Sequence, residues 1–438
     1  MRNRNSMLLL VGGLLLPNAL ALVAGLVAGV PPRTSAIALY AALGLLAGRI
    51  PGWLLGLLCL PVLILDVVLV IDRMFFLGLP VLVDLIDSRV LVGLLASPLY
   101  AGLALALLGS TAAYLAFMVR AGAAMRRGSR PVFAAAAAAL LIGDAVLNGS
   151  AAYDFGPLAS AAKPFESASI QSGFDALPDQ TRPPRRVLLV MVESLGVLRD
   201  PAQRAVLTAP FEDPALRQLY AVATGTSPFF GATASGEMRE LCRTYGGPRQ
   251  LLGGEDPACL PERFAARGYR TAAVHGFHAG FYDRARWYPQ VGFQRSLFGE
   301  ALAPRFARRC PGPFPGPCDT DLVEAVGAEM REGQASFVYW LTLNSHVPVP
   351  GGLATPRLGC GRPGSVFADA EVCAMVEIWQ DLFGAVARLA LAHPGTEILL
   401  VGDHAPPLWR RAAREGFEPG QVAWIRLSPL PVATAALP

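Results

Sequence analysis

Long apolar runs fill the first third of the chain, and short apolar runs recur in the rest of it. Before about residue 150, five stretches are almost free of charged side chains, and short polar segments separate them. Because the hydrocarbon core of a bilayer is about 30 Å thick, a helix needs about 20 apolar residues to cross it. The pattern therefore predicts a transmembrane domain over 1–150, with spans at about 7–30, 35–48, 52–71, 91–119 and 131–149.

The basic residues around these runs predict how the domain is oriented. Arg2 and Arg4 precede the first run, and four arginines lie between 120 and 130, after the fourth run. Cytoplasmic segments of membrane proteins are enriched in Lys and Arg. A cytoplasmic N-terminus followed by five spans places the chain after residue 150 outside. We therefore expect a multi-pass protein of the bacterial inner membrane, with its second half in the periplasm.

Two features of the apolar part have more than one interpretation. Residues 72–89 mix apolar and acidic side chains, which is typical of an amphipathic helix lying in the membrane interface. Asp66 and Asp144 fall inside predicted spans, where an acid is a functional candidate by default. Both lie near the end of a span, so packing or snorkelling toward water explains them equally well.

After a linker at 151–185, rich in Ala, Ser, Pro and Gly, the pattern changes to short apolar strands that alternate with helical segments. The predicted strands are RVLLVMVES, YRTAAVHG, SFVYWLTLNSH and TEILLVGDH, and the predicted helices are DTDLVEAVGAEMREG and EVCAMVEIWQDLFGAVARLALAH. Such alternation is typical of a mainly parallel sheet covered on both faces. We therefore expect an α/β domain over 186–438.

Composition agrees with a membrane protein and argues against a nucleic-acid partner. Hydrophobic residues make up 53% of the chain, the mean hydropathy is +0.43, and the formal net charge is only +4. Six of the seven cysteines lie after residue 240 as near neighbours, which suggests disulfides in an oxidising compartment. Sequential pairing, 242–259, 310–318 and 360–373, is our hypothesis, and free buried thiols are the alternative. Cys59 lies in a predicted span.

Polar residues follow the predicted strands and suggest a metal site. Glu193 follows the run LLVMV, Asp403 and His404 follow ILLVG, and Thr233 lies in the turn FFGATASGE before a helical segment. Strand ends are where α/β sheets place reactive groups, and carboxylate, imidazole and hydroxyl groups can share one divalent cation. The cation would activate Thr233 as a nucleophile, with Ser235 the next candidate. Taken singly, Glu193 is better explained as a strand-end residue that caps the next helix, and Thr233 is equally well explained as a helix cap.

Histidines and an arginine add candidates for a phosphate site. His275 and His346 each end a predicted strand, and Arg284 follows in a loop. Arginine is a natural partner for phosphate oxygens. His278 and His393 lack a comparable context, and we interpret them as structural.

Together these segments resemble the lipoteichoic acid synthase family of the alkaline phosphatase and sulfatase superfamily. The resemblance covers about residues 185–430 and rests on five motifs in the family's order: VESLG, GATASGE, HGFHAGFYDRARWYPQVGF, TLNSHVP and GDH. The membrane part also resembles that family. The resemblance implies one bound divalent metal, Mn²⁺ or Zn²⁺, with Mg²⁺ as a further option.

The resemblance also implies roles for individual residues. The implied metal ligands are Glu193, Thr233, Asp403 and His404. The implied catalytic groups are Thr233, which forms a phospho-threonine, and His346, which protonates leaving groups. The implied contacts to the phosphate and head group come from His275, Tyr282, Arg284 and His346.

Three departures from the family pattern bear on the substrate. Phe277 follows the H-G pair where a polar residue is usual, Tyr282 replaces a Trp, and Ala405 follows GDH. They argue against polymerising lipoteichoic acid synthesis and favour relatives that decorate periplasmic glucans, surface polysaccharides or a lipid-linked acceptor with phosphoglycerol or phosphoethanolamine. Within the resemblance, Arg284 favours phosphoglycerol, taken from phosphatidylglycerol. The alternatives are phosphoethanolamine transfer from phosphatidylethanolamine to lipid A or a glycan, hydrolysis by a phosphodiesterase or sulfatase, and a non-catalytic scaffold. A sulfatase would require a C/S-x-P-x-R motif, which does not occur near residue 233.

Overall fold

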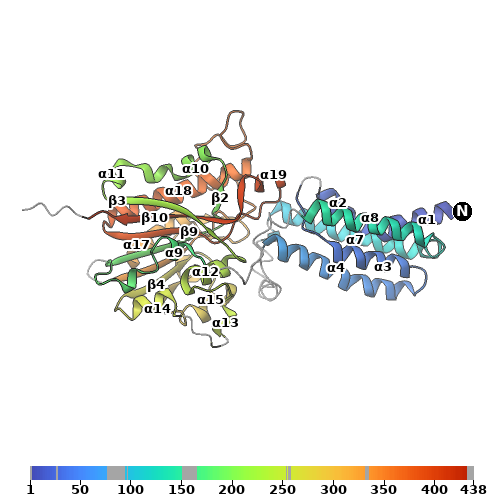
Figure 1. Ribbon diagram of the computed structural model, residues 1–438, viewed down its shortest axis with the longest axis horizontal. Helices are drawn as coiled ribbons and strands as arrows, with labels where there is room; N and C mark the ends of the chain where they lie inside the picture. Colours follow the sequence, from blue (N-terminus) through green and yellow to red (C-terminus); the bar gives the residue numbers. More distant parts are fainter. Residues whose placement is uncertain are drawn as a thin grey trace, which may run out of the picture. The chain divides into compact units, whose positions relative to one another are not determined.

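The computed structural model describes residues 2–25, 28–75, 94–95, 97–149, 165–252, 254, 258–330 and 335–431. The chain forms two compact units, one helical and one α/β (Figure 1). The first comprises Met1–Val83, Leu95–Gly156 and Trp409–Arg414, and the second comprises Asp84–Leu94, Pro157–Leu408 and Glu415–Pro438. Most of the expected amphipathic helix at 72–89, and the first part of the expected linker, lie outside the described residues.

The first unit is a bundle of apolar helices. Its helices are α1 (Arg2–Leu10), η1 (Val11–Leu15), α2 (Leu16–Ala24), α3 (Thr34–Leu46), α4 (Gly52–Phe75), α7 (Pro98–Met125) and α8 (Arg130–Gly149). Among the described residues, four stretches are long and apolar enough to cross a membrane: Asn3–Ala24, Gly52–Phe75, Pro98–Met125 and Arg130–Gly149. The fifth, α3, is a shorter apolar helix of 13 residues.

The helix ends differ from the expected limits of the spans for local reasons. Helix α2 ends at Ala24, with Gly25, a poor helix former, as its C-cap residue. Helix α7 begins at Pro98, where a missing N–H costs nothing. Helix α7 continues through Arg120 to Met125, because a long arginine side chain can reach the interface from within a helix.

A polar cluster joins the helices of the first unit. The Nε atom of Arg33 donates to Oδ1 of Asp66 at 2.8 Å, its Nη2 atom also bonds that carboxylate, and its Nη1 atom donates to Asn18 at 3.2 Å. The backbone N–H of Arg33 donates to Oδ2 of Asp144 at 2.9 Å. Asn18, Asp66 and Asp144 are each less than a tenth exposed. The two intramembrane acids therefore share one partner and hold α2, α4 and α8 to the start of α3.

The second unit is built on one mixed sheet. Its strands are β1 (Arg186–Val192), β2 (Gly196–Leu198), β3 (Tyr220–Pro228), β4 (Arg270–His275), β5 (Arg295–Leu297), β8 (Ser336–Leu341), β9 (Thr396–Gly402) and β10 (Phe417–Pro429). The order is β2-β10-β9-β1-β8-β4-β5, and β3 also pairs with β10. From β9 to β5 every pairing is parallel. The expected mainly parallel sheet is confirmed.

Helices cover both faces of this sheet, since β1 and β8 are buried along almost their whole length. The second unit contains α9 (Ala168–Gln171), α10 (Pro201–Thr208), α11 (Pro214–Arg217), α12 (Thr233–Cys242), α13 (Arg249–Leu252), α14 (Leu260–Ala265), α15 (Arg284–Trp287), α16 (Gly299–Leu302), α17 (Asp319–Glu329) and α18 (Ala370–Ala392). The four expected strands and the two expected helices, α17 and α18, all form.

Four strands in the described part of the sheet were not expected: the short strands β2 and β5, and the longer antiparallel strands β3 and β10. Strand β10 contains Pro419 and Gly420, which normally interrupt a strand, and it is only half buried. Strand β3 is rich in Thr, Ser and Gly and is mostly exposed. Their polar, interrupted sequences lack the strong apolar signal of the central strands, which explains why pattern reading misses them.

The cysteine prediction is confirmed. Disulfides join Cys242 to Cys259, Cys310 to Cys318, and Cys360 to Cys373. The second of them closes the small hairpin of β6 (Arg309–Cys310) and β7 (Gly316–Pro317). Cys59 is free and buried.

Candidate metal centre and phosphate site

The strand register explains why distant residues meet at one edge of the sheet. Val192, the last residue of β1, pairs with Gly402, the last residue of β9. The residues that follow, Glu193 and Asp403, therefore leave the sheet side by side. His275, which ends β4, pairs with Leu341, which ends β8, so a second pair of strands ends at the same edge. This edge is where a parallel α/β sheet places its reactive groups.

Glu193 is only 2% exposed, and hydrogen bonds fix both its backbone and its side chain. Its backbone N–H donates to the Thr342 hydroxyl at 3.0 Å, and its carbonyl oxygen accepts from the Ser345 hydroxyl at 2.6 Å. The Ser194 hydroxyl donates to Oε1 of Glu193 at 2.8 Å. Burial, reinforced by the neighbouring Asp403 carboxylate, raises the pKa of Glu193 well above its usual value. A cation placed between the two acids would favour the ionised form of both.

The two carboxylate oxygens of Asp403 differ in the hydrogen bonds that they accept. Oδ1 accepts the backbone N–H groups of Ser194 at 2.8 Å and of His404 at 2.7 Å. Oδ2 is fully buried, and within the described part of the chain it accepts no hydrogen bond. A buried carboxylate oxygen without a donor is costly in a protein interior unless a cation serves it. The preceding Gly402 is required sterically, because a Cβ there would lie 2.1 Å from the Leu195 carbonyl oxygen.

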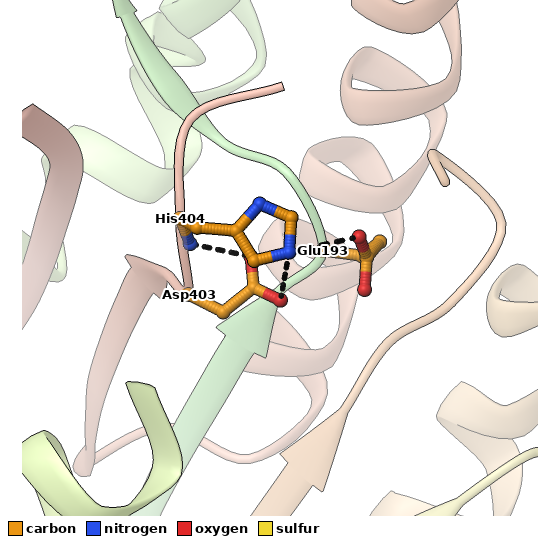
Figure 2. Close-up of side chains that lie close together, drawn as sticks. All are labelled: Glu193, Asp403 and His404. Carbon is orange, nitrogen blue, oxygen red and sulfur yellow. Dashed lines mark hydrogen bonds and ion pairs between the residues drawn. The ribbon is translucent and has the colours of Figure 1, made fainter. Parts of the chain in front are cut away.

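His404 turns a lone pair toward the two acids. Its Nδ1 lies 2.9 Å from the carbonyl oxygen of Ala405, and because a carbonyl can only accept, Nδ1 carries the proton. In the neutral ring Nε2 is then free of a proton, and it lies 3.4 Å from Oδ2 of Asp403 and 3.6 Å from Oε1 of Glu193. Figure 2 shows the imidazole facing both carboxylates. A carbonyl partner on the far nitrogen is the usual arrangement for a metal-binding histidine.

The three residues fit a divalent metal. Their ligand atoms all lie within 4.8 Å of one another. A tetrahedral site with bonds of about 2.1 Å separates its ligand atoms by about 3.4 Å, close to the distances measured from Nε2. Two carboxylates and one imidazole are a donor set that suits Zn²⁺ or Mn²⁺. Glu193, Asp403 and His404 can therefore hold such an ion, as the sequence predicts.

Thr233 begins helix α12, and that helix is fastened to the metal cluster. Arg239 lies on α12 and donates from Nη2 to the Gly402 carbonyl oxygen at 2.7 Å and from Nη1 to the Asp403 carbonyl oxygen at 3.1 Å. Gly236, one turn into the helix, touches Asp403, since a Cβ there would approach its Cα atom to 3.0 Å. The first turn of α12, with the 9%-exposed Thr233, thus lies against Asp403. A helix N-terminus also favours an anion.

Arg284 is buried in an ion pair with Glu237 of α12. Its Nε and Nη2 atoms donate to Oε2 of Glu237 at 3.0 and 2.8 Å. Oε1 of Glu237 accepts from the hydroxyl of Tyr288 at 2.5 Å and from that of Tyr339 at 3.2 Å. Arg284 is 1% exposed and Glu237 is fully buried. Most of the guanidinium of Arg284 is therefore engaged with Glu237, and Nη1 is the atom that remains for other partners.

That remaining Nη1 atom of Arg284 lies 3.4 Å from Nε2 of His275. The other ring nitrogen of His275, Nδ1, lies 3.1 Å from the carbonyl oxygen of Leu341, so Nδ1 donates and Nε2 accepts. Burial and the charge of Arg284 lower the pKa of His275 well below its usual value, so the ring is neutral. Tyr282 is also buried, with the guanidinium carbon of Arg284 5.1 Å from its ring centre. Its pKa is raised by burial and, further, by the charges of Glu193 and Asp403.

His346 follows β8 and is partly buried. Its Nδ1 lies 2.7 Å from the Val347 carbonyl oxygen, and its ring packs edge-on against Phe314 at 4.5 Å. Phe314 comes from the disulfide-closed hairpin and also contacts Phe277 and Phe281. Burial lowers the pKa of His346 to about 4. The imidazole is therefore neutral at pH 7 in the absence of a bound substrate.

Several residues of this site were not singled out from sequence. Ser194, Arg239, Ser345 and Phe314 are ordinary residue types in ordinary contexts, and their roles come from long-range contacts. Glu237 was visible only as the last letter of the GATASGE motif. Its spacing of four residues from Thr233, one helical turn, is the signal that could have found it.

Comparison with known proteins agrees with this fold. The profile of the family described as Sulfatase matches residues 185–357, which include Glu193, Thr233, His275, Arg284 and His346. The expected sulfatase-like domain is thus confirmed. No curated protein sequence matches the chain.

Three solved structures are similar in fold to this chain. The lipoteichoic acid synthase LtaP from Listeria monocytogenes is 14% identical, with a TM-score of 0.42, over 60% of this chain and 72% of that one. The Streptococcus pyogenes phosphoglycerol transferase GacH, in complex with sn-glycerol-1-phosphate, is 14% identical, with a TM-score of 0.41, over 58% and 72%. The periplasmic domain of EcEptC from Escherichia coli, in complex with Zn, is 14% identical, with a TM-score of 0.37, over 56% and 73%.

Proposed function

We propose that this chain is a membrane-bound, metal-dependent transferase that moves a phosphoglycerol group from phosphatidylglycerol to a periplasmic or surface glycan, through a phospho-threonine at Thr233. The observation that carries the proposal is the contact between Gly236 and Asp403. It brings the first turn of the helix that begins with Thr233 against the cluster of Glu193, Asp403 and His404. A hydroxyl beside a cation site and at a helix N-terminus is suited to attack a phosphate ester.

The proposed reaction has two balanced steps. In the first, Oγ of Thr233 forms a bond to the phosphorus of the lipid head group, the bond from phosphorus to the diacylglycerol oxygen breaks, and that oxygen takes up the proton. In the second, a glycan hydroxyl attacks the same phosphorus, its proton is released, and Thr233 leaves with a proton restored to Oγ. The metal, when bound, lowers the pKa of the Thr233 hydroxyl and screens the negative charge of the phosphate.

Protein groups other than the metal ligands complete the proposed site. His275, Tyr282 and Arg284 would position the phosphate and head group from one side. His346 is proposed to pass the proton to the leaving oxygen. Since His346 is neutral in this structure, it would first accept the proton that Thr233 releases.

The apolar helices support a lipid donor, because an enzyme that draws on phospholipid must stay at the membrane. The three disulfides support an oxidising compartment such as the periplasm for the second unit. We propose an inner-membrane location with a cytoplasmic N-terminus on these grounds, together with the arginine-rich segment between 120 and 130.

Intact-mass spectrometry tests the proposal. The full-length protein in detergent is incubated with Mn²⁺ and either phosphatidylglycerol or phosphatidylethanolamine. We expect a phosphoglycerol adduct that peptide mapping assigns to Thr233, absent in Thr233→Ala and retained in Ser235→Ala. A phosphoethanolamine adduct at Thr233 would keep the mechanism and change the donor. An adduct retained in Thr233→Ala but lost in Ser235→Ala would reassign the nucleophile.

The sulfatase-family match keeps a hydrolase as the second candidate. In that case water would replace the glycan hydroxyl in the second step. Turnover of a generic phosphodiester or sulfate ester, with no adduct from either lipid, would favour it. A formylglycine sulfatase is disfavoured, because Thr233 cannot be converted to formylglycine and no C/S-x-P-x-R motif lies near it.

A further inference from the structure

The helical unit forms an apolar, half-open cavity that the proposed chemistry does not use. Its volume is about 460 Å³, and it lies among α2, α4 and α7. Its walls are formed mainly by aliphatic side chains, such as Leu20 of α2, Leu63 of α4 and Leu107 of α7. An apolar cavity of this size is poorly filled by water, because water needs polar partners there.

The cavity is elongated along helix α4. On α4 its lining residues recur every three or four positions from Gly56 through Leu60, Leu63 and Val67 to Met74, which is one face of the helix. Eighteen residues at a rise of 1.5 Å correspond to about 27 Å. The cavity therefore follows α4 over nearly the thickness of a bilayer core. An extended chain fits such a shape better than a compact ligand does.

The charged groups in the wall are already neutralised. Arg33 and Asp66 line the cavity, and they bond each other through two guanidinium nitrogens. The third guanidinium nitrogen donates to Asn18. Tyr114 is 4% exposed, and its uncharged hydroxyl forms no hydrogen bond among the described residues. The wall thus offers a ligand hydrocarbon contacts rather than an unpaired charge.

The cavity wall is continuous with the outer surface of the bundle. Leu60 lines the cavity and is also 54% exposed. In a membrane, that exposed surface faces lipid, and lipid chains are the hydrocarbon present at the highest concentration. An acyl chain can therefore enter sideways without crossing a polar barrier.

We propose that this cavity binds one acyl chain of a membrane glycerophospholipid. The inference goes beyond the transferase function, because it concerns hydrocarbon binding within the helices and needs no reaction at Thr233. Dispersion contacts and the exclusion of water stabilise the bound chain. The site would retain a phospholipid on the protein after detergent has removed the loosely associated lipids.

Neighbouring leucines on α7 provide a matched pair of variants for the test. Leu107 lines the cavity, whereas Leu108 is 68% exposed and points away from it. Leu107→Trp fills the cavity, and Leu108→Trp adds the same bulk to the outer surface. Gly56→Leu is a second filling variant, because a Cβ at Gly56 meets no atom within 4 Å.

The measurement is native mass spectrometry of the full-length protein, stripped of lipid in detergent and then exposed to vesicles of dioleoyl phosphatidylglycerol and phosphatidylethanolamine. We expect one tightly retained phospholipid in the wild type and in Leu108→Trp. In Leu107→Trp and Gly56→Leu the retained fraction should fall about tenfold or more, since losing the burial of even two methylenes costs that much affinity.

Circular dichroism checks that each variant is folded, and if Leu107→Trp is not, Gly56→Leu decides the test. Equal retention in the filled variants, or no retained lipid in the wild type, would overturn the proposal. So would an isoprenoid lipid found in the cavity instead of a phospholipid when the protein is purified directly from cells. Because the test counts bound lipid and not turnover, it can fail while the transferase proposal stands, and the reverse also holds.

Discussion

Arg239 donates a hydrogen bond of 2.7 Å to the carbonyl oxygen of Gly402, and so fastens the helix that carries Thr233 to the strand that leads into Asp403. The same guanidinium donates from Nε to Oε1 of Glu240 at 2.6 Å, and Arg239 is only 1% exposed. Glu240 in turn accepts the backbone N–H groups of Ala168 and Ser169. The position of the proposed nucleophile therefore depends on a buried ion pair that touches no substrate.

We predict that Arg239→Met lowers both stability and turnover. Removing one partner of a buried ion pair leaves Glu240 without its cation, which costs about 3–5 kcal/mol. Thermal unfolding in detergent should show a clearly lower midpoint, and formation of the Thr233 adduct should slow. The control is Arg217→Met, which breaks the exposed pair with Glu212 and should change the unfolding free energy by about 1 kcal/mol or less. An unchanged midpoint in Arg239→Met would contradict the anchoring role.

Asp403→Asn is predicted to remove the metal. The substitution replaces the carboxylate by a neutral amide, and if the amide nitrogen takes the place of Oδ2, a donor faces His404. The metal affinity should fall by about 10- to 100-fold or more, because even changes to residues around metal ligands cost that much. Inductively coupled plasma mass spectrometry of protein equilibrated with increasing metal concentrations measures the loss. Asp381→Asn is the matched control, since Asp381 pairs with Arg357 and not with the cluster. Full metal occupancy in Asp403→Asn would exclude Asp403 as a ligand.

Gly402→Ala is predicted to disrupt the site through sterics alone. Its Cβ would lie 2.1 Å from the Leu195 carbonyl oxygen, and because that atom belongs to the backbone it cannot rotate away. Overpacking of this kind costs about 1–3 kcal/mol, and the shift moves Asp403 as well. Gly351→Ala is the control, because a Cβ there meets nothing within 4 Å. Thermal unfolding and metal content should both decrease in the first variant and stay unchanged in the second.

The raised pKa of the buried Asp319 carboxyl group predicts that the stability of the fold depends on pH. Burial raises the pKa of Asp319 from 3.8 to about 6, although it accepts N–H groups from Leu343 and Asn344. Between these values the folded state holds a proton that the unfolded state has released, so this group destabilises the fold as the pH rises from about 4 to about 6. The total cost is about 3 kcal/mol and is complete above pH 6.

The measurement for Asp319 is the difference in unfolding midpoint between Asp319→Asn and the wild type at several pH values. From pH 4 to pH 6, the unfolding midpoint of Asp319→Asn should rise relative to that of the wild type. Above pH 6 the difference between the two midpoints should stay constant. Asp321→Asn is the matched control on the same helix, since Asp321 is more exposed and pairs with Arg308. If the difference for Asp319→Asn does not change with pH, the pKa of the Asp319 carboxyl group is not raised in the folded state.

Much of the second unit was predictable, because its central strands are continuous apolar runs. Glu193, His275, His346, Asp403 and His404 lie at or after the ends of those strands, and their roles stay predictions. What the sequence could not supply is the register, which sets Val192 opposite Gly402 and so brings Glu193 beside Asp403. Register comes from packing between strands that lie more than 200 residues apart.

The edge of the sheet and the surroundings of the site were less predictable. Strands β3 and β10 form because each satisfies the backbone of the other, although neither has a strong apolar pattern. Arg284 was expected to contact phosphate, and that role stays a prediction. The structure adds Glu237, whose carboxylate binds most of its guanidinium. Such pairing depends on a helix and a loop that meet only in the folded domain.

The cluster around Arg33 has a consequence for the insertion of the protein into the membrane during its synthesis. Both acidic partners of Arg33 come from helices that are made later. Asp66 on α4 pairs with its guanidinium, and Asp144 on α8 accepts its backbone N–H. While the ribosome has released only α1 to α3, Arg33 has no acidic partner in the bilayer and must remain at the water interface. The hairpin can settle to its final depth only after α4 has been inserted, and the backbone of Arg33 gains its acceptor only with α8. Translation products that stop short of α8 should therefore be incompletely assembled and be preferred substrates of membrane quality-control proteases.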